Sequence, residues 1–500
     1  MTITYGNNKR WWILVAVMFA FLPVVIDMTV LHVAIPTLTQ SLGSSSTEVL
    51  WIIDIYPLIM AGLLVPMGTL ADKIGNQKIL LVGLCLFGIA SVCAAFSQNS
   101  LMLIGSRALL ALGGSMIIPC VLGIIRRTFE DDNERAIALG LWGTIGSTGA
   151  ALGPIIGGGL LEHYWWGSVF LINVPIMFII APACYFLLSR KEITTDREWK
   201  IGQALMLISG IIALVYALKS GIAGKQSLNI ILLFSVFGLA MLIIFVRKQL
   251  RSNQPMLDIS LFTQPAILAG IIIAVVASGA LAGVELTLAQ ELQYVIGLTP
   301  LQAGFFMIPI MVGAAVGGPI ASFLSNTLGL RLVATVSLLI ASGSLISLAY
   351  SDLHNPELIV PSILAILGLT LSIGLTASSI AIMGSVPPDK GGAAGSLEGT
   401  GYELGTGLGI TFFGVFMSSL FSNAIKIPSD IASSLAEQAS QSIGDTYLVA
   451  TKLSKEQGVI LIDTAKTAFS TAHIILLSIA ALIIGILAII VFFMLAKYRK

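Results

Sequence analysis

The chain is dominated by apolar segments about 20 residues long, and this pattern constrains its fold more than any other feature. A helix needs about 20 apolar residues to cross a bilayer. By that measure the sequence has fourteen candidate spans, at approximately 11–34, 48–70, 78–97, 101–125, 136–161, 167–188, 201–219, 228–246, 265–291, 301–324, 330–350, 357–383, 393–421 and 472–496. Only 10% of the residues are charged, against about 25% in soluble domains. We therefore expect an all-α polytopic membrane protein with 14 transmembrane helices.

The distribution of Lys and Arg predicts how these helices are oriented, because cytoplasmic loops carry an excess of both. With the N-terminus placed inside, cytoplasmic segments hold 19 of the 26 Lys and Arg residues. Outside loops hold six, including Lys219, and Arg107 lies within a span. This bias predicts that both termini are cytoplasmic.

An internal repeat predicts two related halves. Residues 68–75 follow the second span, and residues 322–329 follow the tenth with the same spacing. The fifth and thirteenth spans both carry glycines at helical spacing, which permits close helix contact. The second and fifth spans thus correspond to the tenth and thirteenth. We expect a six-helix half at 1–190, an inserted helix pair at 191–252 and a second six-helix half at 253–500.

A long loop at 422–470 separates the last two spans. Ser429 and Asp430 can cap one helix, and Ser454 to Gln457 has the sequence of a capping box for a second. We expect an extracytoplasmic helical hairpin here, a candidate lid over the exit. The alternative is a disordered loop.

Five acids and one arginine lie within the spans and away from their ends: Asp27, Asp54, Glu285, Glu398, Glu403 and Arg107. A carboxylate in hydrocarbon costs several kcal/mol, roughly 2.5–3.5 on insertion scales, so such residues usually mark functional sites. The simpler alternatives are a polar residue for helix packing, a structural Asp–Arg pair and, for Glu398, a solvated face. Excess acid in a cavity attracts cations and can exchange them for protons.

The position of each charge along its span predicts which of them meet. Asp27, Asp54 and Arg107 fall at one depth in the outer half, so we expect the two aspartates to share this arginine. Glu285 also falls in the outer half, whereas Glu291 is expected to be solvated. Glu398 and Glu403 fall between the inner half and the midplane, and they point about 140° apart. Glu403 is therefore the better candidate to face the cavity.

Aromatic residues near these acids could accommodate flat cationic rings. The candidates are Trp51, Tyr56, Trp142 and Tyr402. For each one taken singly, ordinary packing is the simpler interpretation.

A glycine-rich motif follows the second span and predicts a cytoplasmic gate. Gly68, Asp72, Gly75 and Lys78 occur there in the pattern G-x-x-x-D-x-x-G-x-x-K. The glycines permit a tight turn. Asp72 can bond a helix N-terminus or a basic residue in one state of the gate and release it in the other.

This motif resembles the loop motif of the major facilitator superfamily. Arg107 in the segment 103–114 is similar to that family's fourth-helix motif. The fifth span resembles its antiporter motif, through Gly149, Gly153, Pro154 and Gly157. Residues 26–36 and 170–175 resemble the first and sixth helices of the fourteen-helix drug:proton antiporters. Within that group, residues 51–56 and 398–405 look most like the quaternary-ammonium and methyl-viologen exporters.

The resemblance covers essentially the whole chain, but three positions depart from it. His32 stands where the family usually has Asn, Gly167 and Ser168 replace an Arg-Trp pair, and the tenth span has no acid. The last departure puts that family carboxylate in doubt here. Glu285 is the candidate substitute.

The acids and the resemblance together predict a proton-coupled antiporter of the bacterial cytoplasmic (inner) membrane. It would export mono- and divalent lipophilic cations such as quaternary ammonium antiseptics, dyes and viologens. One alternative is an exporter of an endogenous metabolite such as a polyamine or an amino acid. Another is a transporter-like sensor without flux.

Other function classes find no support in the sequence. No Walker lysine follows a glycine-rich loop, the four His have no metal spacing, and the four Cys lie in apolar segments. We therefore expect no enzyme activity, no metal and no cofactor other than the coupling protons. The expected partners are the lipid bilayer and small-molecule cations, with no nucleic acid, and we expect a functional monomer.

Overall fold

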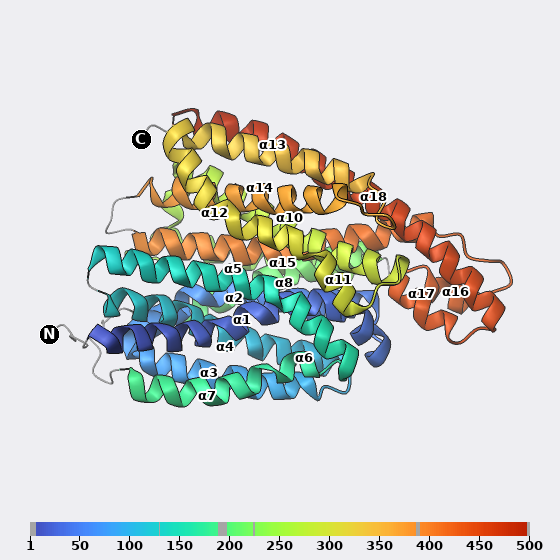
Figure 1. Cartoon of the computed structure of the whole chain (residues 1–500), viewed down its shortest axis with the longest axis horizontal. Helices are drawn as coiled ribbons and strands as arrows, with labels where there is room; N and C mark the ends of the chain where they lie inside the picture. Colours follow the sequence, from blue (N-terminus) through green and yellow to red (C-terminus); the bar gives the residue numbers. More distant parts are fainter. Residues whose placement is uncertain (1–6, 130, 189–197, 224–225, 387–390, 498–500) are drawn as a thin grey trace.

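The structure, a computed structural model, describes residues 7–129, 131–188, 198–223, 226–386 and 391–497. Every regular element within these ranges is a helix. Fourteen helical segments of the described chain are long and apolar enough to cross a membrane, which confirms the predicted polytopic all-α fold. In Figure 1 both termini lie at one end of the bundle, and α16 and α17 project beyond the other. We call these the terminal end and the hairpin end.

Short connections join the first six spans. The first six are α1 (Asn7–Leu42), α2 (Ser46–Ile74), α3 (Asn76–Ala95), α4 (Ser100–Thr128), α5 (Asp132–His163) and α6 (Ser168–Leu171) with α7 (Asn173–Leu187). The inserted pair is α8 (Ile201–Ala223) and α9 (Leu228–Arg251). After η1 (Ile259–Thr263) come α10 (Pro265–Gln290) with η2 (Glu291–Val295), α11 (Pro300–Phe306) with α12 (Ile308–Leu328), α13 (Leu330–Ala349), α14 (Ile359–Met383), α15 (Gly391–Ala424) and α18 (Lys455–Met494), which η4 (Leu495–Lys497) ends.

The helix ends are set by local sequence. Ser45 and Thr299 form capping boxes at the starts of α2 and α11, which satisfy N–H groups that have no partner within the helix. Gly75 separates α2 from α3 with a φ of 112°, and Gly329 separates α12 from α13 with a φ of 86°. Residues with a Cβ atom rarely adopt such φ values. The two copies of the repeat therefore make the same kind of turn.

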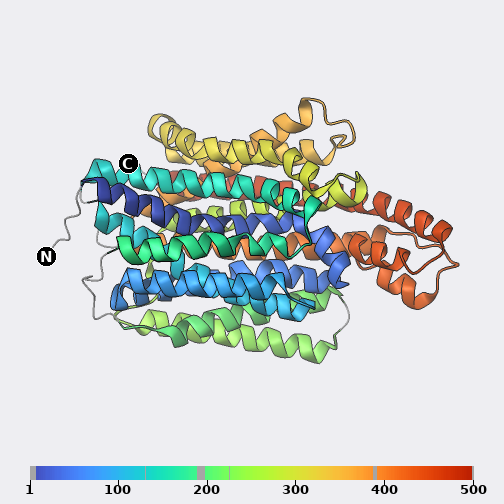
Figure 2. The same ribbon diagram turned by 60° about the horizontal axis from the view of Figure 1, so that its bottom comes forward.

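Buried apolar residues form one cluster mainly within α1–α7 and another mainly within α10–α18. A third cluster joins α8 to α2, α10 and α15. Figure 2 shows α8 and α9, in light green, at the edge of the bundle. This grouping favours the predicted division into two halves and an inserted pair. The first boundary, at residues 190 and 191, lies outside the described residues.

The segment between the last two spans folds as a helical hairpin, as predicted. It contains α16 (Ser433–Ala439) and α17 (Ile443–Ala450), which pack with the first turns of α18 around Ile431, Val449 and Leu461. The predicted cap at Ser454 is present, but the predicted cap at Asp430 is wrong. Asp430 caps no helix, and it accepts a hydrogen bond from Gln457 instead (2.7 Å). The helix that Ser454 caps continues without a break into the last span, since residues 459–484 contain neither Gly nor Pro.

Candidate functional site

The glycines of α5 hold it against the part of α1 that carries Asp27. A Cβ atom at Gly153 would lie 2.0 Å from the Thr29 hydroxyl oxygen, and one at Gly157 would lie 2.5 Å from Val30. A Cβ at Gly149 would lie 2.9 Å from Leu22. No described residue lies within 4 Å of a Cβ at Gly140, so the predicted close contact begins further along α5. On the far side of α5, a Cβ at Gly304 of α11 would lie 2.7 Å from the Pro154 carbonyl oxygen.

Asp27 and Arg107 form an ion pair between α1 and α4 in which both side chains are buried, with exposed fractions of 0% and 1%. Arg107 Nε also donates to the carbonyl oxygen of Ile52 on α2 (3.1 Å). The guanidinium carbon lies 4.6 Å from the centre of the Tyr56 ring. Arg107 thus joins three helices, as their similar depths predict. The Asp27 Oδ1 atom has no hydrogen-bond partner within the described residues.

Asp54 does not share this arginine, and that prediction is wrong. Its Oδ2 atom lies 2.6 Å from the Nζ atom of Lys219, and it accepts a hydrogen bond from the Thr411 hydroxyl (2.7 Å). Lys219 is only 3% exposed, so its assignment to an outside loop is also wrong. The reason is that α8 continues to Ala223, which places Lys219 within the helix and against α2.

Glu285 of α10 and the two acids of α15, Glu398 and Glu403, have no basic partner in the described part of the chain. Glu285 and Glu403 are 8% and 9% exposed, and Glu403 Oε2 is buried without a hydrogen-bond partner. Glu398 accepts a hydrogen bond from the Tyr402 hydroxyl (2.6 Å). Glu291 is buried rather than solvated. It accepts a hydrogen bond from Ser470 (2.6 Å) and lies 3.4 Å from His473 Nδ1, because α18 covers this end of α10.

Three of the four candidate aromatics contact a charged group. Tyr56 lies against Arg107, Tyr402 donates to Glu398, and the Trp51 ring centre lies 3.9 Å from Lys219 Nζ. Trp142 stacks instead on Phe21, with ring centres 5.2 Å apart. For Trp142 the packing interpretation therefore has the better support.

The predicted gate motif lies where α2 turns into α3. Asp72 accepts a hydrogen bond from Arg127 at the end of α4 (3.2 Å), and both side chains are exposed to a similar degree. A Cβ at Gly68 would lie 3.4 Å from Pro119 of α4, and Gly75 makes the turn. Lys78 is exposed. In this structure Asp72 thus bonds a basic residue rather than a helix N-terminus.

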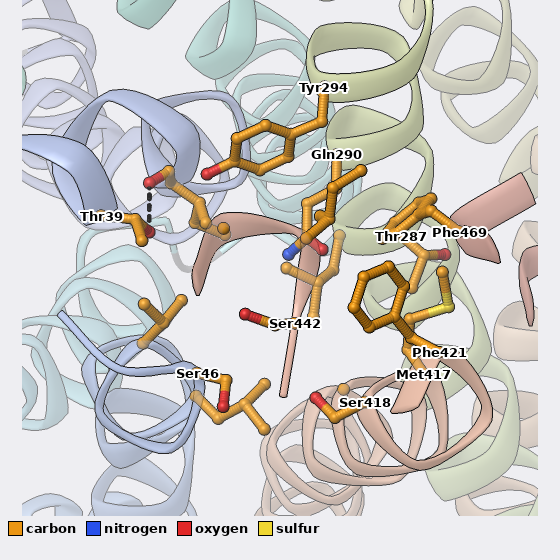
Figure 3. A pocket seen from close by; sticks show the side chains of 17 residues that line it. Thr39, Ser46, Thr287, Gln290, Tyr294, Met417, Ser418, Phe421, Ser442 and Phe469 are labelled. Atoms are coloured by element: carbon orange, nitrogen blue, oxygen red, sulfur yellow. Dashed lines mark hydrogen bonds between the residues drawn. The ribbon is translucent and has the colours of Figure 1, made fainter. Parts of the chain in front are cut away.

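At the hairpin end, a small cavity of about 50 Å³ is lined by residues of α1, α2, α10, η2, α15, α18 and the hairpin (Figure 3). Gln293 donates to the Val33 carbonyl oxygen (3.0 Å), and Tyr447 of α17 donates to that of Tyr294 (2.6 Å). The Ser46 backbone N–H donates to the carboxylate of Asp445 (3.4 Å). The hairpin and η2 are therefore hydrogen-bonded to the first two helices at this end. The role of the hairpin as a lid stays a prediction.

Sequence reasoning missed Lys219 and Thr411, which complete the surroundings of Asp54. A signal for Lys219 was present, since the apolar segment continues past it as Ser220, Gly221, Ile222 and Ala223. Nothing near Thr411 in the sequence distinguishes it from other hydroxyl residues in the spans.

Comparison with known proteins places this chain among membrane transporters. The family model described as Major Facilitator Superfamily matches residues 17–410. The chain is 44% identical over 492 residues to the methyl viologen resistance protein SmvA of Salmonella typhimurium, covering 98% of this chain and 99% of that protein. It is 33% identical over 482 residues to the multidrug efflux pump LfrA of Mycolicibacterium smegmatis, covering 94% and 93%. A bacterial homolog of the human lysosomal transporter Spinster, solved in an inward-facing and unoccupied conformation, has a TM-score of 0.71 at 16% identity and covers 99% of both chains.

Proposed function

The chain belongs to the Major Facilitator Superfamily, and on that premise we propose that it exports mono- and divalent lipophilic cations in exchange for protons. It is a multi-pass membrane transporter and not an enzyme. The substrate class is suggested by the similarity to a methyl viologen resistance protein along nearly the whole chain. The surplus of buried acid supports the same class.

The observation that carries this proposal is the imbalance between buried acids and buried bases. All five predicted acids are buried, and two of them, Asp27 and Asp54, pair with Arg107 and Lys219. A buried carboxylate without a counter-ion is strongly destabilising, so it takes up a proton or a cation. Glu285 and Glu403 supply such groups, whereas Glu398 accepts a hydrogen bond from the Tyr402 hydroxyl, and a lipophilic cation can replace the proton.

This exchange accounts for antiport by alternating access. When the site faces the cytoplasm, loss of a proton lets a cation bind. When the site faces outside, protonation releases the cation. The Asp27–Arg107 pair can take part because Asp27 keeps one oxygen that no described residue hydrogen-bonds. The repeat and the positive loop residues support two rocking halves with both termini in the cytoplasm.

The test is transport by purified protein in liposomes under an imposed pH gradient. Wild type should move both a monovalent dye and methyl viologen. Transport of each substrate should be accompanied by proton movement in the opposite direction. Asp27→Asn should reduce both fluxes by roughly tenfold or more, the loss expected when one charged contact is removed. Asp352→Asn, which changes an exposed acid between α13 and α14, is the matched control and should behave as wild type.

Full export of both substrates by Asp27→Asn would contradict the exchange role of Asp27. Flux of a polyamine or an amino acid without flux of either lipophilic cation would contradict the substrate class. Substrate binding without any proton movement in wild type would contradict antiport altogether.

A further inference from the structure

Lys219 brings a buried positive charge from the inserted helix pair into the bundle. It lies on α8, and its ammonium pairs with Asp54 of α2 at 2.6 Å. The same ammonium lies 3.9 Å from the centre of the Trp51 ring. The mechanism of proton and cation exchange described above makes no use of this residue.

The groups around the ammonium are those that would bind a lipophilic cation. An aromatic face attracts a cation through its ring quadrupole, most strongly for Trp. The Asp54 carboxylate supplies the opposite charge, and its Oδ1 atom has no hydrogen-bond partner in the described chain. Thr411 of α15 fixes the orientation of the carboxylate by donating to Oδ2. Trp51, Asp54 and Thr411 thus form a cation site, which we call the Trp51–Asp54 site.

An apolar groove adjoins this site. It has a volume of about 640 Å³ and lies between α2, α8 and α9. Trp51, Tyr216, Phe234 and Phe237 are among its lining residues. Trp51 belongs to both the groove and the cation site. The apolar body of a lipophilic cation could therefore lie in the groove while its charge reaches Asp54.

We infer that Lys219 is a tethered competitor, whose ammonium occupies the Trp51–Asp54 site until a lipophilic substrate cation displaces it. The substrate class in this inference rests on the proposed function. Exchange of one cation for another keeps Asp54 neutralised, so displacement avoids the cost of an unpaired buried carboxylate. The long flexible stem of lysine lets the ammonium withdraw while α8 stays in place. The simpler alternative is a fixed ion pair that only fastens α8 to α2.

Binding of tetraphenylphosphonium, a permanent monovalent lipophilic cation, separates the two roles. A site that is open for only a fraction of the time has its apparent Kd raised by the inverse of that fraction. Lys219→Met should therefore bind the probe about tenfold more tightly than wild type in calorimetry on the purified full chain. Asp54→Asn should abolish this gain, so Asp54→Asn and the double variant with Lys219→Met should have equal Kd values.

The control is Lys248→Met, which removes an exposed lysine from α9 and should leave the Kd unchanged. An equal or weaker Kd in Lys219→Met would overturn the inference, as would a gain that persists without Asp54. A purely structural pair predicts a lower unfolding temperature in Lys219→Met with no tighter binding.

A second measurement uses the wild-type chain and does not depend on the folding of a variant. A membrane-permeant acetylating reagent should modify Lys219 slowly, and saturating tetraphenylphosphonium should raise that rate several-fold while Lys248 stays constant. An unchanged rate at Lys219 would overturn the inference. If wild-type liposomes export no lipophilic cation but Lys219→Met still tightens binding, the proposed function fails and the competitor stands. Normal export by wild type, with unchanged probe binding in Lys219→Met and an unchanged acetylation rate at Lys219, would contradict the competitor role of Lys219 and leave the proposed function intact.

Discussion

The acids of the first two helices and the acids of α10 and α15 are neutralised in different ways. Asp27 and Asp54 each pair with a base on another helix, Arg107 on α4 and Lys219 on α8. Glu285 and Glu403 are buried to a similar degree, yet neither has a basic partner within the described residues. Removing one partner of a buried pair leaves an uncompensated charge, whereas removing a lone acid leaves none. The first region should therefore contribute more to stability than the second, whose lone acids can be neutralised singly without leaving an unpaired charge.

Arg107→Met tests the first half of this contrast and should have the largest effect. It strips Asp27 of its counter-ion and Ile52 of its donor, at a cost of about 3–5 kcal/mol. The purified protein should unfold at a clearly lower temperature, followed by circular dichroism. The double variant with Asp27→Asn should recover part of the loss. A wild-type unfolding temperature in the single variant would contradict the contribution of the Asp27–Arg107 pair to stability.

Glu403→Gln tests the second half. The amide carries no charge, so the fold should keep its wild-type unfolding temperature. Export should fall by roughly tenfold or more, and the remaining flux should depend less on the pH gradient. Glu437→Gln, an exposed change of the same kind on α16, is the control and should export normally. Normal pH-dependent export in Glu403→Gln would move proton exchange to another acid.

The lengths of the apolar segments predicted the fold because bilayer thickness fixes the length of a spanning helix. Two predicted spans are broken, at Ile172 and at Met307. The signals were Pro175 and Pro309, which each lie within the first three residues of the helix after the break and cannot donate a backbone hydrogen bond. The length of an apolar segment does not by itself predict such a break in the helix.

The candidate site was predicted less completely than the fold. Position along a span gives depth, and this was enough to bring Arg107 to Asp27. It does not give the direction in which a side chain points, so it could not tell whether Arg107 or another base meets Asp54. Lys219 is 165 positions from Asp54 in the chain, and ending the span at a charged residue placed it outside. Only the packing of α8 on α2 reveals the pair.

Glu285→Gln should sharpen the contrast by separating substrates according to charge. A divalent cation needs a second acid, and Glu285 of α10 is one of the buried acids that have no basic partner among the described residues. We expect methyl viologen export to fall several-fold, roughly 3–10-fold, while export of a monovalent dye changes little. Initial rates in liposomes at saturating substrate are the measurement. Equal losses for both substrates would assign Glu285 to proton exchange rather than to the second charge.

Glu398→Gln should have the smallest effect of the four. The Tyr402 hydroxyl, which donates to Glu398 at 2.6 Å, can donate equally to an amide oxygen, so the local hydrogen bond survives. We expect export of both substrates within about twofold of wild type. Tyr402→Phe is the sharper partner experiment, because it removes the donor and leaves the carboxyl of Glu398 without this hydrogen bond. Loss of such a buried bond costs about 1 kcal/mol, so Tyr402→Phe should lower stability more than Glu398→Gln does. If Glu398→Gln instead lowers export as strongly as is expected of Glu403→Gln, Glu398 and Glu403 exchange protons together.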